Sequence, residues 1–123
     1  MRLLIAVVDD EESVRKALQR LIRSAGLEVE TFASGEDFFL SMQKRQPDCV
    51  VLDLHMPQMN GFEVQRLLAQ AGTAVPLVII TGHDTDESRE RALKAGAAAY
   101  LRKPVDDRML LDAIAAAVGH GTS

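Results

Sequence analysis

Four stretches of the chain are continuously apolar, and each has the length of a strand that is buried on both faces of a parallel sheet. A fifth stretch alternates apolar residues with Glu28 and Glu30, which favours a strand at the edge of the sheet. The predicted strands are residues 3–8, 27–32, 49–52, 77–80 and 97–101.

Between these stretches, apolar residues recur every three or four positions, as they do on the buried face of a helix. Gly26, Gly72 and Gly96 follow three of these segments, and glycine is a common helix stop. Ser34 followed by Asp37 is typical of a helix start. The predicted helices cover about residues 14–25, 35–42, 62–71, 84–95 and 107–118.

Alternating strands and helices predict an α/β fold, in which a doubly wound, five-stranded parallel sheet is covered by helices on both faces. The 123 residues suffice for one domain with a substantial core. We expect the domain to span residues 1–118, and residues 119–123 to form a flexible tail or the start of a linker.

Composition limits the partners and the cellular compartment expected for this domain. The formal net charge of −4 argues against direct nucleic-acid contact by this domain. The single cysteine, Cys49, lies in an apolar strand without an intrachain partner, which favours a reducing compartment. No apolar run approaches the roughly 18 residues of a membrane helix, and the start is too soon acidic for a signal peptide. We therefore expect a cytoplasmic protein without membrane contact.

Polar side chains stand where the predicted core strands end. Asp9 and Asp10 follow the first strand, Asp53 the third, Thr81 the fourth and Lys103 the fifth. Parallel strands all end at one edge of a sheet, where open α/β sheets bind their ligands, so these groups can converge. Taken alone, Asp53 could simply start a turn or cap the next helix.

The chemistry of this set points to phosphoryl transfer. Three close carboxylates repel one another unless a cation holds them, and Mg²⁺ prefers such oxygen ligands. A carboxylate such as Asp53 can accept a phosphoryl group as a nucleophile. That reaction needs charge neutralisation and positioning, which a metal ion, the Lys103 ammonium and the Thr81 hydroxyl would supply.

The whole chain resembles the receiver domains of two-component response regulators, and specifically the FixJ-like group. The matching segments are Val8-Asp9-Asp10-Glu11, the run LDLHMPQMNG from Leu52 to Gly61, Ile80-Thr81-Gly82 and Lys103-Pro104. Val105 after Lys-Pro departs from the OmpR-like group. The resemblance implies a flavodoxin-like sheet with strand order 2-1-3-4-5.

By resemblance, Asp53 is the phospho-acceptor, with a sensor histidine kinase or phosphotransfer protein as the donor. Asp10, Asp53 and the backbone carbonyl of His55 would bind Mg²⁺, and Asp9 would help through water. The domain would catalyse only its own phosphorylation and dephosphorylation, so we do not class it as an enzyme.

The remaining residues of the resemblance belong to a switch. Thr81 and Lys103 would contact the phosphoryl group, Tyr100 would be the switch aromatic, and the Lys103–Pro104 bond would be cis. Phosphorylation would then change the surface of the last two helices and the last strand. That change would control a phosphorylation-dependent homodimer or an output domain, often for transcription. No DNA-binding domain follows, so we expect either a single-domain regulator or an excised receiver.

His55 and His83 lie two positions after Asp53 and Thr81, where receivers tune the lifetime of the phosphoryl group. Alternatively, both are solvated loop histidines. Imidazole ligation of the metal is not expected, because a carboxylate-rich site prefers hard oxygen chemistry. Glu11 is interpreted as a favourable charge in the first turn of a helix.

Three other functions share some of these features. A haloacid dehalogenase-class phosphatase needs a second acid two residues after the nucleophile, where this chain has His55. A flavodoxin-like FMN binder needs a phosphate loop after the first strand, where residues 9–12 are all acidic. A phosphorylation-independent receiver used as an interaction module stays open as the alternative.

Overall fold

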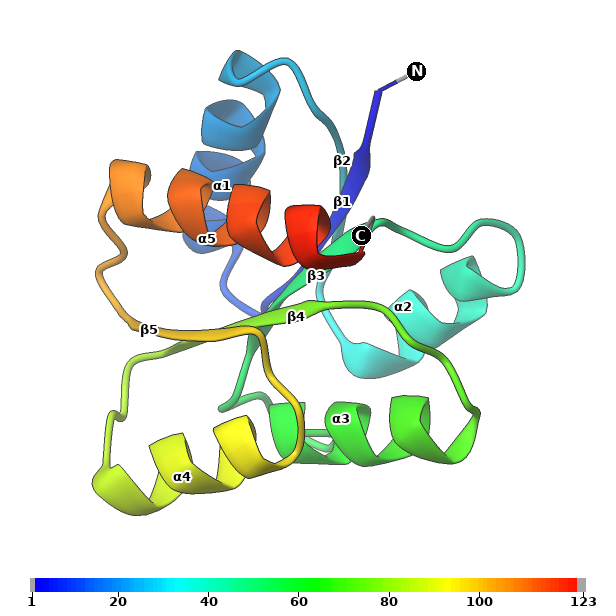
Figure 1. The fold of residues 1–123 in the computed structure, drawn as a ribbon, viewed down its shortest axis with the longest axis vertical. Coiled ribbons are helices and arrows are strands. Elements are labelled where there is room, and N and C mark those ends of the chain that lie inside the picture. Colours follow the sequence, from blue (N-terminus) through cyan, green and yellow to red (C-terminus); the bar gives the residue numbers. More distant parts are fainter. Residues whose placement is uncertain (1, 122–123) are drawn as a thin grey trace.

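The computed structural model describes residues 2–121, in which five strands and five helices alternate along the chain (Figure 1). The strands are β1 (Leu4–Val8), β2 (Glu28–Phe32), β3 (Cys49–Asp53), β4 (Leu77–Thr81) and β5 (Ala99–Arg102). The helices are α1 (Glu12–Ser24), α2 (Gly35–Met42), α3 (Gly61–Gln70), α4 (Asp86–Lys94) and α5 (Asp107–Gly121). All neighbouring strands pair in parallel in the order β2-β1-β3-β4-β5, which confirms the predicted fold.

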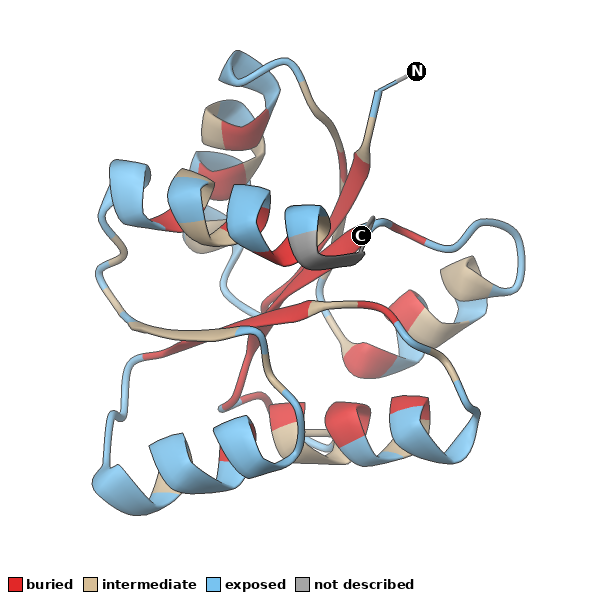
Figure 2. Ribbon diagram, in the orientation of Figure 1, coloured by how far each residue is buried: buried red, intermediate tan, exposed pale blue. Residues whose placement is uncertain are grey.

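Helices cover both faces of the sheet (Figure 1). Because side chains alternate along a strand, each central strand contributes to two cores. Val50 and Leu52 of β3 pack in the core under α2, α3 and α4. Val51, between them, packs in the core under α1 and α5. Every residue of β1, β3 and β4 is buried, as Figure 2 shows, whereas β2 is an edge strand as predicted.

The starts of α4 and β5 lie later than the sequence predicted. Helix α4 begins at Asp86 rather than near residue 84, because the Thr85 hydroxyl caps it by accepting a hydrogen bond from the Ser88 amide at 3.0 Å. Strand β5 begins two residues late, because the Ala97 amide still bonds to the Ala92 carbonyl of α4.

The last helix extends into the residues that were expected to form a flexible tail. Helix α5 continues past Val118 to Gly121, so residues 119–121 are helical. Residues 122–123 of that expected tail lie outside the described residues. Over residues 2–121, no helix combines the length and apolar character that a bilayer span requires.

Candidate functional site

The carboxyl edge of the sheet brings the predicted acidic residues together. Val8 pairs with Leu52, so the chain leaves neighbouring strands at Asp9 and Asp53. Both are buried, whereas Asp10 is exposed. One carboxylate oxygen from each of these three aspartates lies within 4.8 Å of the other two. The sheet thus builds the cluster that the sequence predicted.

The electrostatics of this cluster fit a hard divalent cation. Burial, followed by the Asp9 carboxylate, raises the pKa of Asp53 to about 6, against the opposing effect of Lys103. A site that disfavours its own ionised carboxylates gains most from a bound positive charge. The donors are all carboxylate oxygens, which is the ligand type that Mg²⁺ prefers.

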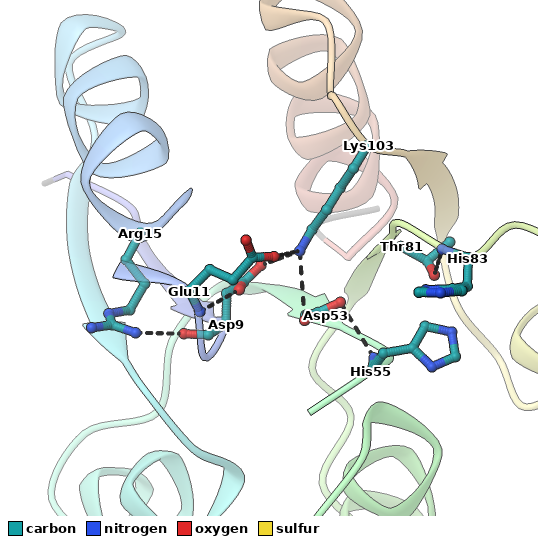
Figure 3. Close-up of polar contacts among 8 residues, drawn as sticks. All are labelled: Asp9, Glu11, Arg15, Asp53, His55, Thr81, His83 and Lys103. Carbon is teal, nitrogen blue, oxygen red and sulfur yellow. Dashed lines mark hydrogen bonds and ion pairs between the residues drawn. The ribbon is translucent and has the colours of Figure 1, made fainter. Parts of the chain in front are cut away.

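Lys103 closes the cluster from the β5 side (Figure 3). Its Nζ lies 2.8 Å from Asp9 Oδ2, 3.2 Å from Glu11 Oε1 and 3.5 Å from Asp53 Oδ2. Burial by itself lowers the pKa of Lys103, but these three carboxylates outweigh it and raise the pKa above its ordinary value. The ammonium is therefore held in its charged form beside Asp53.

Thr81 stands at the end of the neighbouring strand β4 and is fully buried. Its Oγ1 accepts a hydrogen bond from the His83 amide at 3.0 Å. In the same way, Asp53 Oδ1 accepts a hydrogen bond from the His55 amide at 3.3 Å. The two histidine rings consequently lie side by side, with centroids 4.9 Å apart and planes at 66° (Figure 3).

The loop after Asp53 is held by backbone contacts. The Gly61 amide donates to the Leu54 carbonyl at 2.9 Å, and Asn60 with Glu63 forms a reciprocal capping box at the start of α3. A Cβ at Gly61 would lie 2.7 Å from the Asp53 carbonyl oxygen, so only glycine allows this approach. Gln58 takes a positive φ of 69° within the loop.

Tyr100 and Pro104 occupy β5 and the loop beyond it. Tyr100 is half-buried against the core under α2, α3 and α4. Burial and the Asp84 carboxylate raise the pKa of its hydroxyl. Its polar neighbours thus belong to the β4–α4 loop rather than to the acidic cluster. The Lys103–Pro104 peptide bond is cis, the isomer that the resemblance implies.

Sequence reasoning missed two residues of the site. Glu11 was interpreted only as a helix-start charge, yet it forms an ion pair with Lys103. Arg15 Nη1 donates to the Asp9 backbone carbonyl at 2.9 Å. The available signal was position, because Glu11 directly follows the acidic pair and Arg15 lies one helical turn beyond it.

Comparison with known proteins places this site in a family. The family model described as the response regulator receiver domain matches residues 5–115. The response regulator protein TodT of Pseudomonas putida is 39% identical over 115 residues, which are 94% of this chain and 51% of TodT. The transcriptional regulatory protein FixJ of Rhizobium meliloti is 35% identical over 116 residues, covering 94% of this chain and 57% of FixJ.

A solved structure agrees with these relatives. The crystal structure of a response regulator receiver protein from Burkholderia phymatum shares 46% sequence identity and superposes with a TM-score of 0.85, covering 96% of both chains. The chain spans about half the length of the curated relatives that it matches. It belongs to the response regulator receiver domain family of two-component systems, and within that family it is FixJ-like.

Proposed function

We propose that this receiver domain accepts a phosphoryl group on Asp53 in a Mg²⁺-dependent reaction in the cytoplasm. The donor would be a sensor histidine kinase or a phosphotransfer protein. The observation that carries the proposal is the position of Lys103 Nζ, 3.5 Å from Asp53 Oδ2 inside a three-carboxylate cluster. Positive charge is thus already placed where a phosphoryl group on Asp53 would need it.

The chain's own residues supply the steps of the transfer. A carboxylate oxygen of Asp53 attacks the phosphorus of a phosphohistidine, and the phosphorus–nitrogen bond breaks with its electron pair passing to the imidazole nitrogen. The ammonium of Lys103 then pairs with the new charge. When bound, Mg²⁺ supplies further positive charge to the phosphoryl oxygens. Asp10, Asp53 and the His55 carbonyl would hold it, and Asp9 would act through water.

Thr81 would recognise the phosphoryl group as a hydrogen-bond donor. Its Oγ1 already accepts a hydrogen bond from the His83 amide, so its own proton stays available to a phosphoryl oxygen. Movement of Thr81 toward that oxygen would leave room for Tyr100 to repack. The result is a population shift between two packings, driven by contacts that exist only with the phosphoryl group.

The output surface would be formed by α4, β5 and α5. Leu93 on α4 and Met109 on α5 expose apolar side chains, at 42% and 58% of their surface. Such side chains suit a surface that is covered when the switch is on. Phosphorylation would control a homodimer or an output domain through this surface, while the domain catalyses only its own phosphorylation and dephosphorylation.

The direct test is the intact mass of the protein after incubation with acetyl phosphate, with and without Mg²⁺. We expect a phosphoryl adduct that requires Mg²⁺ and disappears in an Asp53→Asn variant. An Asp112→Asn variant is the matched control, because that carboxylate is exposed on α5 and should leave the adduct unchanged. An adduct that persists in Asp53→Asn would refute the assignment of the acceptor.

A negative result would favour the alternative function. If neither acetyl phosphate nor a cognate kinase labels the wild type, the domain is better described as a phosphorylation-independent interaction module. The fold and the family would be unaffected by that result.

A further inference from the structure

The imidazoles of His55 and His83 contact each other beside the acidic cluster and are not part of it (Figure 3). His55 is the second residue after the end of β3, and His83 is the second residue after the end of β4. These strands are hydrogen-bonded neighbours, so the two loops leave the sheet side by side. The pairing therefore follows from the topology of the sheet.

The backbone of each histidine is fixed by a buried side chain. The His55 amide donates to Asp53 Oδ1, and the His83 amide donates to Thr81 Oγ1. Both histidines are exposed beyond these anchors. The fixed backbones lower the ordering cost of chelation, and each ring can still turn about its side-chain torsions to aim a nitrogen at a shared ion.

The spacing of the rings suits two ligands of one metal ion. A tetrahedral ion with metal–nitrogen distances of about 2.0–2.1 Å holds two imidazole centroids about 5 Å apart. The His55 and His83 centroids are 4.9 Å apart. Imidazole nitrogen selects zinc, nickel or copper, whereas the acidic cluster offers only the oxygens that magnesium prefers. The two groups of ligands are thus chemically distinct.

We propose that His55 and His83 form a second cation site, which chelates one divalent transition-metal ion of the zinc and nickel class. Two protein ligands leave the other coordination positions to water, so the ion would exchange with the solvent. A bound ion would tie the β3–α3 loop to the β4–α4 loop beside Asp53. The proposal does not depend on phosphorylation, so it can fail or succeed independently of the proposed function.

The test is calorimetric titration of the unphosphorylated chain with Zn²⁺ in excess Mg²⁺, which saturates the oxygen cluster. We expect one Zn²⁺ per chain. Loss of an outer-shell partner alone costs a metal site about 10-fold to 100-fold in affinity, so His55→Gln and His83→Gln should each weaken binding at least about tenfold. His120→Gln, at the third histidine of the sequence, is the matched control and should bind like the wild type.

A second measurement, made on the wild type, distinguishes binding at His55 and His83 from misfolding of a variant and from adventitious binding elsewhere. In proton NMR of the wild type, paramagnetic Ni²⁺ should broaden the ring signals of His55 and His83 before those of His120. Full affinity in either single variant would overturn the proposal. One Zn²⁺ per two chains with dimer formation would also overturn it, because the site would then lie between molecules.

Discussion

At the scale of single residues, the one ammonium of Lys103 lies among three carboxylates. Lys103 keeps only 15% of its side-chain surface exposed, while Asp9 and Asp53 are almost fully buried. Taking Asp53 out of water costs more than Lys103 returns, which is why the pKa of Asp53 stays above its ordinary value. The resting site thus stores unfavourable electrostatic energy at Asp53.

This imbalance predicts how stability depends on pH without Mg²⁺. Because the folded-state pKa of Asp53 is raised to about 6, its favourable contribution is complete below its unfolded pKa and is lost as the pH rises through about 6. Asp53→Asn carries no titrating group. As the pH rises from about 4 to about 8, the free energy of unfolding of Asp53→Asn should therefore increase relative to that of the wild type, by at most about 3 kcal/mol.

Urea unfolding of both proteins in EDTA at the two pH values measures this gain. The Asp112→Asn variant controls for loss of an exposed carboxylate and should show no such pH dependence. A difference between Asp53→Asn and wild type that is equal at both pH values would contradict the assignment of the strain to Asp53.

At the scale of elements, the loop between β3 and α3 is fixed by close backbone packing at Gly61. A Cβ there would meet the Asp53 carbonyl at 2.7 Å and the Leu54 Cα at 2.8 Å, and neither backbone can yield easily. Gly82, in the β4–α4 loop, has its nearest neighbour, Lys103 Cδ, at 4.0 Å. The two loops of the site therefore tolerate a side chain very differently.

Gly61→Ala should lower the free energy of unfolding by about 1–3 kcal/mol, the usual cost of forcing extra volume into a packed region. Gly82→Ala is the matched control and should change it by less than about 0.5 kcal/mol. Chemical denaturation of the two variants decides the matter. Equal stability of both would mean that the β3–α3 loop can move away at little cost.

Helix α4 has one buried residue, Ala92, which is fewer than any other helix of the described chain has. The buried Gln65 of α3 donates from Nε2 to the Ala92 carbonyl at 3.1 Å. The Arg91 guanidinium also lies 4.0 Å above the Phe62 ring. The helix that the proposed switch must move is therefore held by little apolar burial, supplemented by these two contacts with α3.

Gln65→Ala should loosen α4 selectively. A lost buried hydrogen bond is worth about 1 kcal/mol, which corresponds to about fivefold faster amide hydrogen exchange in α4. Exchange in β1 and β3 should stay unchanged. The control is Gln70→Ala, an exposed position of α3, the helix that also carries Gln65. Exchange that accelerates equally throughout the chain would indicate general destabilisation instead.

At the scale of the whole molecule, the sheet connects Asp53, the proposed phospho-acceptor, to the proposed output surface. Asp53, Thr81 and Lys103 stand on β3, β4 and just after β5, so a charge added at Asp53 acts on all three strands at one edge. Because β1, β3 and β4 are fully buried below that edge, we expect any response to be confined to the loops and to α4.

Lys103→Ala should separate phosphorylation from this response. We expect acetyl phosphate still to label Asp53, while the amide NMR shifts of α4, β5 and α5 stay close to those of the unphosphorylated protein. Lys44→Ala, at an exposed residue after α2, should keep both the label and the shifts. A labelled Lys103→Ala protein with the full surface change would show that the lysine does not transmit the signal.

The sequence by itself predicted the order of the elements and the polar residues that stand at the carboxyl edge of the sheet. Runs such as residues 77–80 are apolar throughout, which favours a strand buried on both faces. The recurrence of apolar residues at Val14, Leu18 and Leu21, three and four positions apart, favours a helix. Parallel strands end at one edge, so the convergence of Asp9, Asp53 and Lys103 followed from topology alone.

Only the tertiary structure decided which side chains meet within that edge. Glu11 and Lys103 are 92 residues apart, and the contacts of His55 with His83 and of Gln65 with Ala92 likewise join separate segments. A local sequence pattern predicts whether a segment is a helix or a strand. It does not predict the register of neighbouring strands or the rotamers of their side chains. Those are fixed when both faces of the sheet pack at once, since close packing leaves each side chain few alternatives.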